Sequence, residues 1–308
     1  MAVREVLTDA RSGHRGLFWL SAAMAVLAGG LVIAAAVDDR TLLGAPLWFK
    51  PLKFALSFML YAAALAWMLA KIDRPGRGAR LAGWVIVAAS VVEVLIIVGQ
   101  AARGRRSHFN DDIAFDEMLF SIMGLTIVVL WLATLAIAVR FLRRPGPDPA
   151  TTWAVRLGLL IAVAGMGLGI LMVVGGAHAV GVPDGGPGLP LVGWSTTGGD
   201  LRIGHFIGMH ALQILPLLAA ALATISRLDA STRLRLIMVA AGGYSGLVAI
   251  VTWQALRGQP LLAPDGPTLT AFTALVIGIG VAAAAATAAA RVLPRRETVL
   301  LPTSGCTD

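Results

Sequence analysis

Glu93 is the residue of this chain whose type and setting most invite chemistry, because it is an acid inside a long apolar stretch, 81–102. A charged side chain at membrane depth costs roughly 2.5–3.5 kcal/mol on insertion scales, so it marks a candidate proton or cation site. Lys53 lies at a similar depth in the preceding apolar stretch, and we expect it to pair with Glu93. The alternative is a purely structural ion pair between two helices, with Lys50 snorkelling to the membrane interface. Gln100 shares the helix face of Glu93, two turns further on.

His210 is predicted to lie at a depth similar to that of Glu93, so the two side chains suggest a proton relay of the kind found in pumps and transporters. Gln213 follows His210 on a neighbouring helix face. The alternative for His210 is an interhelical hydrogen bond, worth about 0.6 kcal/mol. The candidate proton and substrate site therefore comprises Glu93, Lys53, His210, Gln100, Gln213 and Gln254.

Four histidines fall near one predicted side of the membrane, and imidazole is a common ligand of transition metals and of haem iron. They are His108, His178, His205 and His210. A haem or copper site built from them is an alternative to the proton site. Residues five apart on a helix point about 140° apart, so His205 and His210 are poorly placed to grip one small ion.

The pattern Gln-Ala-x-Arg-Gly occurs twice, at 100–104 and at 254–258, each time at the end of an apolar stretch. One interpretation is a helix cap, since Gly follows helix ends and Arg suits the last turn. The other places the two glutamines across an outer vestibule, with the two arginines around an anion. We predict an outer mouth that contains Arg103, His108, Asp112, Asp200, Arg202 and Arg257.

The composition places these residues in a membrane protein. Of 308 residues, 57% are hydrophobic and 14% are charged, and the mean hydropathy is +0.81. A soluble domain carries about 25% charged residues, so a soluble enzyme, a disordered chain and a secreted disulfide scaffold are excluded. The one cysteine, Cys306, permits neither an internal disulfide nor an iron–sulfur cluster.

Eight apolar stretches are long enough, at about 20 residues each, to cross a bilayer as helices. Lys and Arg concentrate in the loops on one side of them, which by the positive-inside rule places both termini in the cytoplasm and the protein in the inner membrane. The same rule accounts for the net charge of +8. We therefore expect the lipid bilayer and a small solute or ion as partners, and no nucleic acid, while the oligomeric state stays open. The predicted spans are 17–37, 47–70, 81–102, 116–140, 153–176, 203–226, 234–255 and 268–290.

The chain also shows signs of an internal repeat. The recurring Gln-Ala-x-Arg-Gly pattern, and the arginine-rich exits of the fourth and eighth spans, divide it into 1–148 and 149–308, with four spans each. A repeat with an even number of spans keeps its orientation, so we expect two parallel repeats. The second half differs by a long outer loop, 177–202, and a short cytoplasmic tail. The alternative is that arginine-rich exits recur in any membrane protein.

We therefore predict an all-α integral membrane protein, a bundle of about eight transmembrane helices in two parallel four-helix repeats. Three functions stay open. The first is a proton-coupled transporter of a small solute or ion with a polar site near the outer face. The second is a haem- or copper-binding membrane redox protein, and the third a non-catalytic scaffold or sensor. No P-loop, H-E-x-x-H or dinucleotide fingerprint is present, so no enzyme class is indicated.

Overall fold

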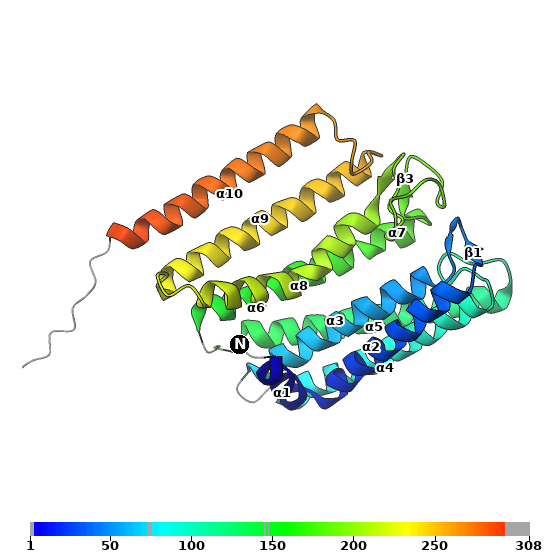
Figure 1. Cartoon of the computed structure of the whole chain (residues 1–308), viewed down its shortest axis with the longest axis horizontal. Coiled ribbons are helices and arrows are strands. Elements are labelled where there is room, and N and C mark those ends of the chain that lie inside the picture. The colour runs from blue at the N-terminus through cyan, green and yellow to red at the C-terminus, as the bar shows by residue number, and fades with distance from the viewer. Residues whose placement is uncertain (1–2, 73–75, 145, 147, 293–308) are drawn as a thin grey trace, which may run out of the picture.

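The protein is an all-α, multi-span membrane protein, as its composition predicts. The computed structural model describes residues 3–72, 76–144, 146 and 148–292. In this part of the chain eight helical segments are long and apolar enough to cross a membrane, and they lie side by side as an elongated bundle (Figure 1). These are α2 (Arg15–Val37), α3 (Phe49–Ala70), α4 (Gly76–Ala102), α5 (Ala114–Leu142), α6 with α7 (Pro149–Gly167 and Gly169–Gly175), α8 (Leu201–Ala223), α9 (Ala230–Leu256) and α10 (Gly266–Val292).

A short helix that the apolar pattern does not predict, α1 (Val3–Gly13), precedes the first span. It packs against the last turns of α3. Asp9 forms an ion pair with Lys71, and Gly13 lies so close to the carbonyl of Ala66 that a side chain there would collide with it. We call the end of the bundle that holds α1 the arginine-rich end. The residues Arg295, Arg296 and Cys306 lie outside the described residues.

The fifth span is broken. The sequence predicts one stretch, 153–176, but the helix is interrupted at Leu168, between α6 and α7. Gly165, Gly167 and Gly169 surround the break, and glycine is a weak helix former that often accompanies kinks. At the break the carbonyl of Gly165 accepts the backbone N–H of Leu168, and its second lone pair can take a partner outside its own helix.

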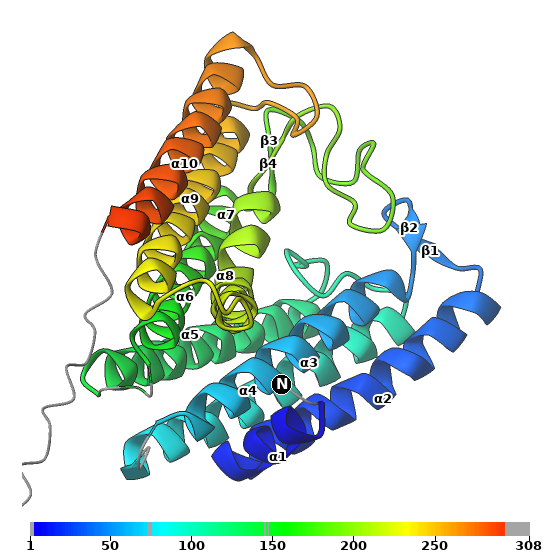
Figure 2. The ribbon, with the colours of Figure 1, turned by 60° about the vertical axis from the view of Figure 1, so that its left-hand side comes forward.

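The helices form two groups. Helices α2–α5 share a buried apolar core that includes Leu65, Ile86 and Ile137, and this core extends to Leu159 of α6 and Leu212 of α8. Helices α6 and α8–α10 form the second group, in which α6 and α8 pack closely through small residues. Figure 2 shows the two groups meeting near α5 and α6 and diverging toward the end opposite α1.

Two short antiparallel strand pairs stabilise the loops at that opposite end, which we call the strand end. Strand β1 (Thr41–Leu42) pairs with β2 (Ala45–Pro46), and β3 (Ala179–Val180) pairs with β4 (Gly199–Asp200). Leu43 and Gly44 both have positive φ, the conformation that a tight two-residue hairpin requires. The β3–β4 pair brings the two ends of the long 177–202 loop together and so sets the start of α8.

Candidate functional site

Glu93 lies on α4 with no exposed surface. Its Oε1 lies 2.6 Å from the hydroxyl oxygen of Thr126 on α5. Its Oε2 has no hydrogen-bond partner among the described residues. The hydroxyl of Ser90, three residues earlier on α4, is likewise buried without a partner. A carboxyl group with one satisfied and one unsatisfied oxygen is thus enclosed at membrane depth, where a charge is expensive.

The contacts of Thr126 favour a protonated Glu93. The Thr126 hydroxyl has a single proton, yet it also lies 3.1 Å from the carbonyl of Ile122 and 3.0 Å from that of Met123. These carbonyl oxygens can only accept a hydrogen bond, whereas a hydroxyl can both donate and accept. If Thr126 donates to its own helix, the short contact with Glu93 requires the carboxyl group to be the donor. The geometry therefore suits a neutral carboxylic acid that can give up its proton.

The two lysines at the start of α3 take other positions than the sequence suggests. Lys53 Nζ donates a hydrogen bond to the carbonyl of Val192 at 3.0 Å, and in the described part of the chain it forms no ion pair with Glu93. Lys50, rather than Lys53, is the lysine within electrostatic range of Glu93. The expected Lys53–Glu93 pair is therefore not formed. Helical side chains tilt toward the helix N-terminus, which carries Lys53 toward the loops of the strand end.

A polar junction joins the two helix groups at the strand end. Asp200 is fully buried and forms a 2.6 Å ion pair with Arg202. The same carboxylate accepts hydrogen bonds from the backbone of Arg202 and of Ser195, so it caps α8 and holds the 177–202 loop. Arg202 and Lys53 both lie within electrostatic range of Lys50. We define the polar junction as Lys50, Lys53, His108, His178, Asp200 and Arg202.

Two histidines of the polar junction are linked by an aromatic ring. Phe109 lies between them, with its ring 6.4 Å from that of His108 and 6.5 Å from that of His178. Burial lowers the pKa of His108 well below its ordinary value of 6.5, and the nearby charge of Lys50 acts in the same direction. Burial also lowers the pKa of His178, against the opposing effect of Asp184, whose Oδ1 lies 2.9 Å from its Nδ1. Both imidazoles are therefore neutral at neutral pH.

The first Gln-Ala-x-Arg-Gly pattern folds the loop between α4 and α5. Gln100 Nε2 and Arg103 Nη1 both donate to Asp116 Oδ1, at 3.0 and 2.7 Å. Asn110 donates to the other carboxylate oxygen, and Asp116 is fully buried. Asp112, which we predicted at the outer mouth, forms an exposed ion pair with Arg106 at 3.1 Å. These polar groups are engaged in holding the loop.

The second pattern folds the loop between α9 and α10 in the same way. Gln254 Nε2 donates to the carbonyl of Pro260 at 2.7 Å, and Arg257 pairs with Asp265 at the start of α10. Gly104 and Gly258 have φ values of 68° and 72°, and the residue after each bonds back to the glutamine carbonyl. Such bonds are those of a helix C-cap. Each glutamine and arginine is thus engaged within its own loop, and the vestibule with an anion between the four side chains is not formed.

The remaining sequence candidates lie on α8. His205 Nδ1 is 2.8 Å from the carbonyl of Gly165, which lies beside the break in the fifth span. His210 and Gln213 are half-buried, and His210 makes no hydrogen bond with Glu93 within the described ranges. The Gln213 Oε1 is buried without a partner. The expected Glu93–His210 couple is therefore not a direct hydrogen bond.

The four histidines do not assemble into a metal site. Within the residues that the structure describes, no group of three or more His, Cys, Asp or Glu side chains is placed to hold a metal ion. His205 is bound to a carbonyl of α6, and His178 is bound to Asp184. Ring contacts surround His108, with Phe54 at 5.7 Å and Phe120 at 6.2 Å.

Sequence reasoning missed Thr126, the residue that contacts Glu93. An isolated threonine in an apolar helix more often bonds to its own backbone, which Thr126 also does. A comparison of depths would have found it, because α4 and α5 are antiparallel neighbours and the two residues lie at similar distances from the connecting loop. A comparison of the chain with protein-family models, with curated proteins and with solved structures finds no match.

Proposed function

We propose that the protein is a proton-linked carrier of a small solute or ion, in which Glu93 binds and releases the proton. The observation that carries the proposal is the buried carboxyl group with one oxygen against Thr126 and the other without a partner. A group so costly at membrane depth is retained for a function more often than for stability. Its short contact with a hydroxyl that already has carbonyl acceptors fits a group that exchanges a proton.

The polar junction lies between Glu93 and the strand end, where it would receive the solute. Lys50 connects the two, because it lies within electrostatic range of Glu93 on one side and of Lys53 and Arg202 on the other. The segments 103–112 and 199–205 form the mouth in this proposal. Broken or proline-containing spans often mark the moving parts and binding sites of carriers. Here the fifth span breaks at Leu168, and α8 contains Pro216.

We also propose that the two halves are parallel repeats. Two pairings support this: α2 packs on α3 as α6 packs on α8, and α4 packs on α5 as α9 packs on α10. The turns at Gln100 and Gln254 have the same cap bonds. The distribution of arginine supports a further part of the proposal, that the protein lies in the cytoplasmic membrane with both termini inside.

The test of the proton site compares wild type, Glu93→Gln and Glu117→Gln, purified in detergent. Glu117 is an exposed glutamate near the start of α5 and serves as the matched control. Infrared difference spectra across an acid-to-base step report the carbonyl stretch of a protonated carboxyl group. We expect one buried-acid band in wild type and in Glu117→Gln, and its loss in Glu93→Gln.

The test of transport uses the same three proteins in liposomes on a solid-supported membrane, with proton-driven currents recorded for a panel of small inorganic and organic ions. We expect currents in wild type and Glu117→Gln that vanish in Glu93→Gln. Full proton-linked transport by Glu93→Gln would refute the role of Glu93. Stoichiometric haem or copper in the purified protein would favour the redox alternative instead.

A further inference from the structure

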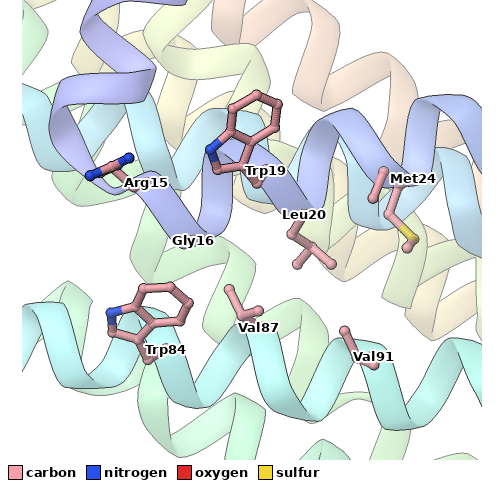
Figure 3. A pocket seen from close by; sticks show the side chains of 9 residues that line it. Arg15, Gly16, Trp19, Leu20, Met24, Trp84, Val87 and Val91 are labelled. Carbon is pink, nitrogen blue, oxygen red and sulfur yellow. The ribbon is translucent and has the colours of Figure 1, made fainter.

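A groove between α2 and α4 opens on the outer surface of the bundle near the arginine-rich end (Figure 3). Its volume is about 580 Å³, within the range of roughly 300–1,000 Å³ typical of small-molecule sites. The walls are apolar. They consist of Trp19, Leu20 and Ala23 from α2 and Trp84, Val87 and Val91 from α4.

His14 fixes the end of the groove nearest α1. Its Nδ1 accepts the backbone N–H of Leu17 at 3.1 Å, so the proton of the neutral ring lies on Nε2, which donates to the carbonyl of Arg80 at 3.0 Å. The ring of Trp84 packs over Gly16, where a Cβ would lie 2.6 Å from it. Helices α2 and α4 are therefore in close contact at the end nearest α1. The groove lies between them further along the two helices.

Positive charge surrounds the end nearest α1. Arg15 lines the groove, and Arg80 lies one helical turn before Trp84 on α4. Both are exposed, and within the described ranges neither guanidinium forms an ion pair with an acid. Apart from the pair between Asp9 and Lys71, the ion pairs in the described part of the chain lie at the strand end. Among the side chains that the structure describes, no acid therefore neutralises either arginine.

The length of the groove matches one leaflet. From Arg15 to Met24 the helix rises by nine residues, or about 13 Å at about 1.5 Å per residue. This is close to half of a hydrocarbon core of roughly 30 Å. Trp19 and Trp84 are each about half exposed, at 55% and 54%, and tryptophan prefers the headgroup level of a membrane. A chain lying in the groove would have its polar end beside the arginines.

We propose that this groove binds one acyl chain of an anionic phospholipid, whose phosphate is held by Arg15 with Arg80 beside it. Basic pockets between membrane helices bind anionic headgroups in this manner. A second copy of the chain fits less well. A two-fold contact uses the same patch on both partners, which would bring the two Arg15 side chains toward one another.

The experiment counts bound lipids by native mass spectrometry of the intact protein. The protein is released from nanodiscs that contain equal amounts of phosphatidylglycerol and phosphatidylcholine with the same acyl chains. The variants are Ala23→Phe, which fills the groove, and Arg15→Gln with Arg80→Gln, which removes its charge. The matched controls are Ala25→Phe, exposed on α2 outside the groove, and Arg143→Gln, at the arginine-rich end of α5.

We expect wild type to retain one phosphatidylglycerol in at least fivefold preference to phosphatidylcholine. Retention should fall at least fivefold in Ala23→Phe and in the double arginine variant, and it should be unchanged in both controls. Equal retention by all variants would overturn the proposal, as would equal retention of the two lipids, since both describe ordinary surface lipid. A dimer that dissociates on Ala23→Phe would also overturn it, in favour of a second copy.

Discussion

Gly165 of α6 and Gly208 of α8 meet backbone to backbone: a Cβ on Gly165 would lie 2.6 Å from the Cα of Gly208. Two turns earlier on α6, a Cβ on Gly158 would lie 2.8 Å from the carbonyl oxygen of Ala211. Close approach through small residues is how membrane helices gain packing energy without a hydrophobic driving force. This contact also positions the carbonyl of Gly165 for its bond with His205.

The substitution Gly165→Ala should destabilise the protein by about 1–3 kcal/mol, the usual cost of forcing an extra carbon into a packed interface. The control is Gly167→Ala on the same helix, where a Cβ would meet nothing within 4 Å. Thermal unfolding in detergent measures both. An equal loss of stability in the two variants would show that the α6–α8 contact is not the cause.

Asp116→Ala should be far more harmful than Asp112→Ala. Asp116 is fully buried and receives hydrogen bonds from Gln100, Arg103 and Asn110. Removing one partner of a buried charged network typically costs about 3–5 kcal/mol. The Asp112 side chain is 47% exposed, and an exposed ion pair contributes about 0–1 kcal/mol. Chemical unfolding of the two variants gives the comparison, and similar losses would contradict it.

Stability should decrease as the pH falls below about 6.5, and His108 should be one cause. Because burial lowers the pKa of His108 in the folded protein, the unfolded chain binds a proton first when the pH falls through 6.5. Stability is then lost with acid and is fully present above that pH. The melting temperature measured between about pH 5 and pH 8 should therefore depend less on pH in His108→Phe. Phe120→Leu, which alters the same ring contact without titrating, should keep the dependence of wild type.

We expect the purified protein to be colourless and to contain no stoichiometric copper. The reason lies in the arrangement of the side chains, because in the described part of the chain no group of three or more His, Cys, Asp or Glu side chains is placed to hold a metal ion. An absorption spectrum and an elemental analysis of the detergent-purified protein are sufficient. A Soret band that disappears in His205→Ala would reverse this expectation.

Labelling of single cysteines will test the orientation. In a Cys306→Ser background, Thr197→Cys at the strand end should react with an impermeant maleimide added to intact cells. Arg77→Cys at the arginine-rich end should react only after permeabilisation. Both positions are exposed. The opposite result would place the termini outside and contradict the positive-inside assignment.

The eight spans could be predicted from the sequence because length and apolarity alone decide which segments cross a membrane. Helix α1 could not, since it is short, carries charge and owes its place to contacts such as Asp9 with Lys71. The break at Leu168 was equally hidden. Glycine is common in membrane helices, so its presence alone does not predict a break. Only the packing of α6 against α8 shows which glycines are needed for close helix contact.

The candidate site was predictable in part. Glu93 stood out because an acid in an apolar helix is rare, and the structure indeed buries it. Its neighbours depend on helix rotation and side-chain direction, which depth alone does not give. Lys53 donates a hydrogen bond to the Val192 carbonyl. Lys50, only three residues earlier, instead lies within electrostatic range of Glu93. His210 was predicted at a depth similar to that of Glu93, yet it makes no hydrogen bond with Glu93 in the described part of the chain.

The hydrogen bond from Lys53 to Val192 joins positions 139 residues apart, and this separation constrains biogenesis. Helix α3 ends at Ala70, 122 residues before Val192. Ribosomes add roughly 5–20 residues per second, so α3 is complete about 6–24 s before its partner exists. In that interval α3, whose hydropathy of 1.7 is the lowest of the eight spans, must enter the bilayer with two lysines in its first turns. The helices made before α3 contact it directly. Ser21 of α2 donates a hydrogen bond to the carbonyl of Met59, and Asp9 of α1 forms an ion pair with Lys71. These contacts need only residues 1–71, so α1 and α2 can stabilise α3 before the second half of the chain is translated.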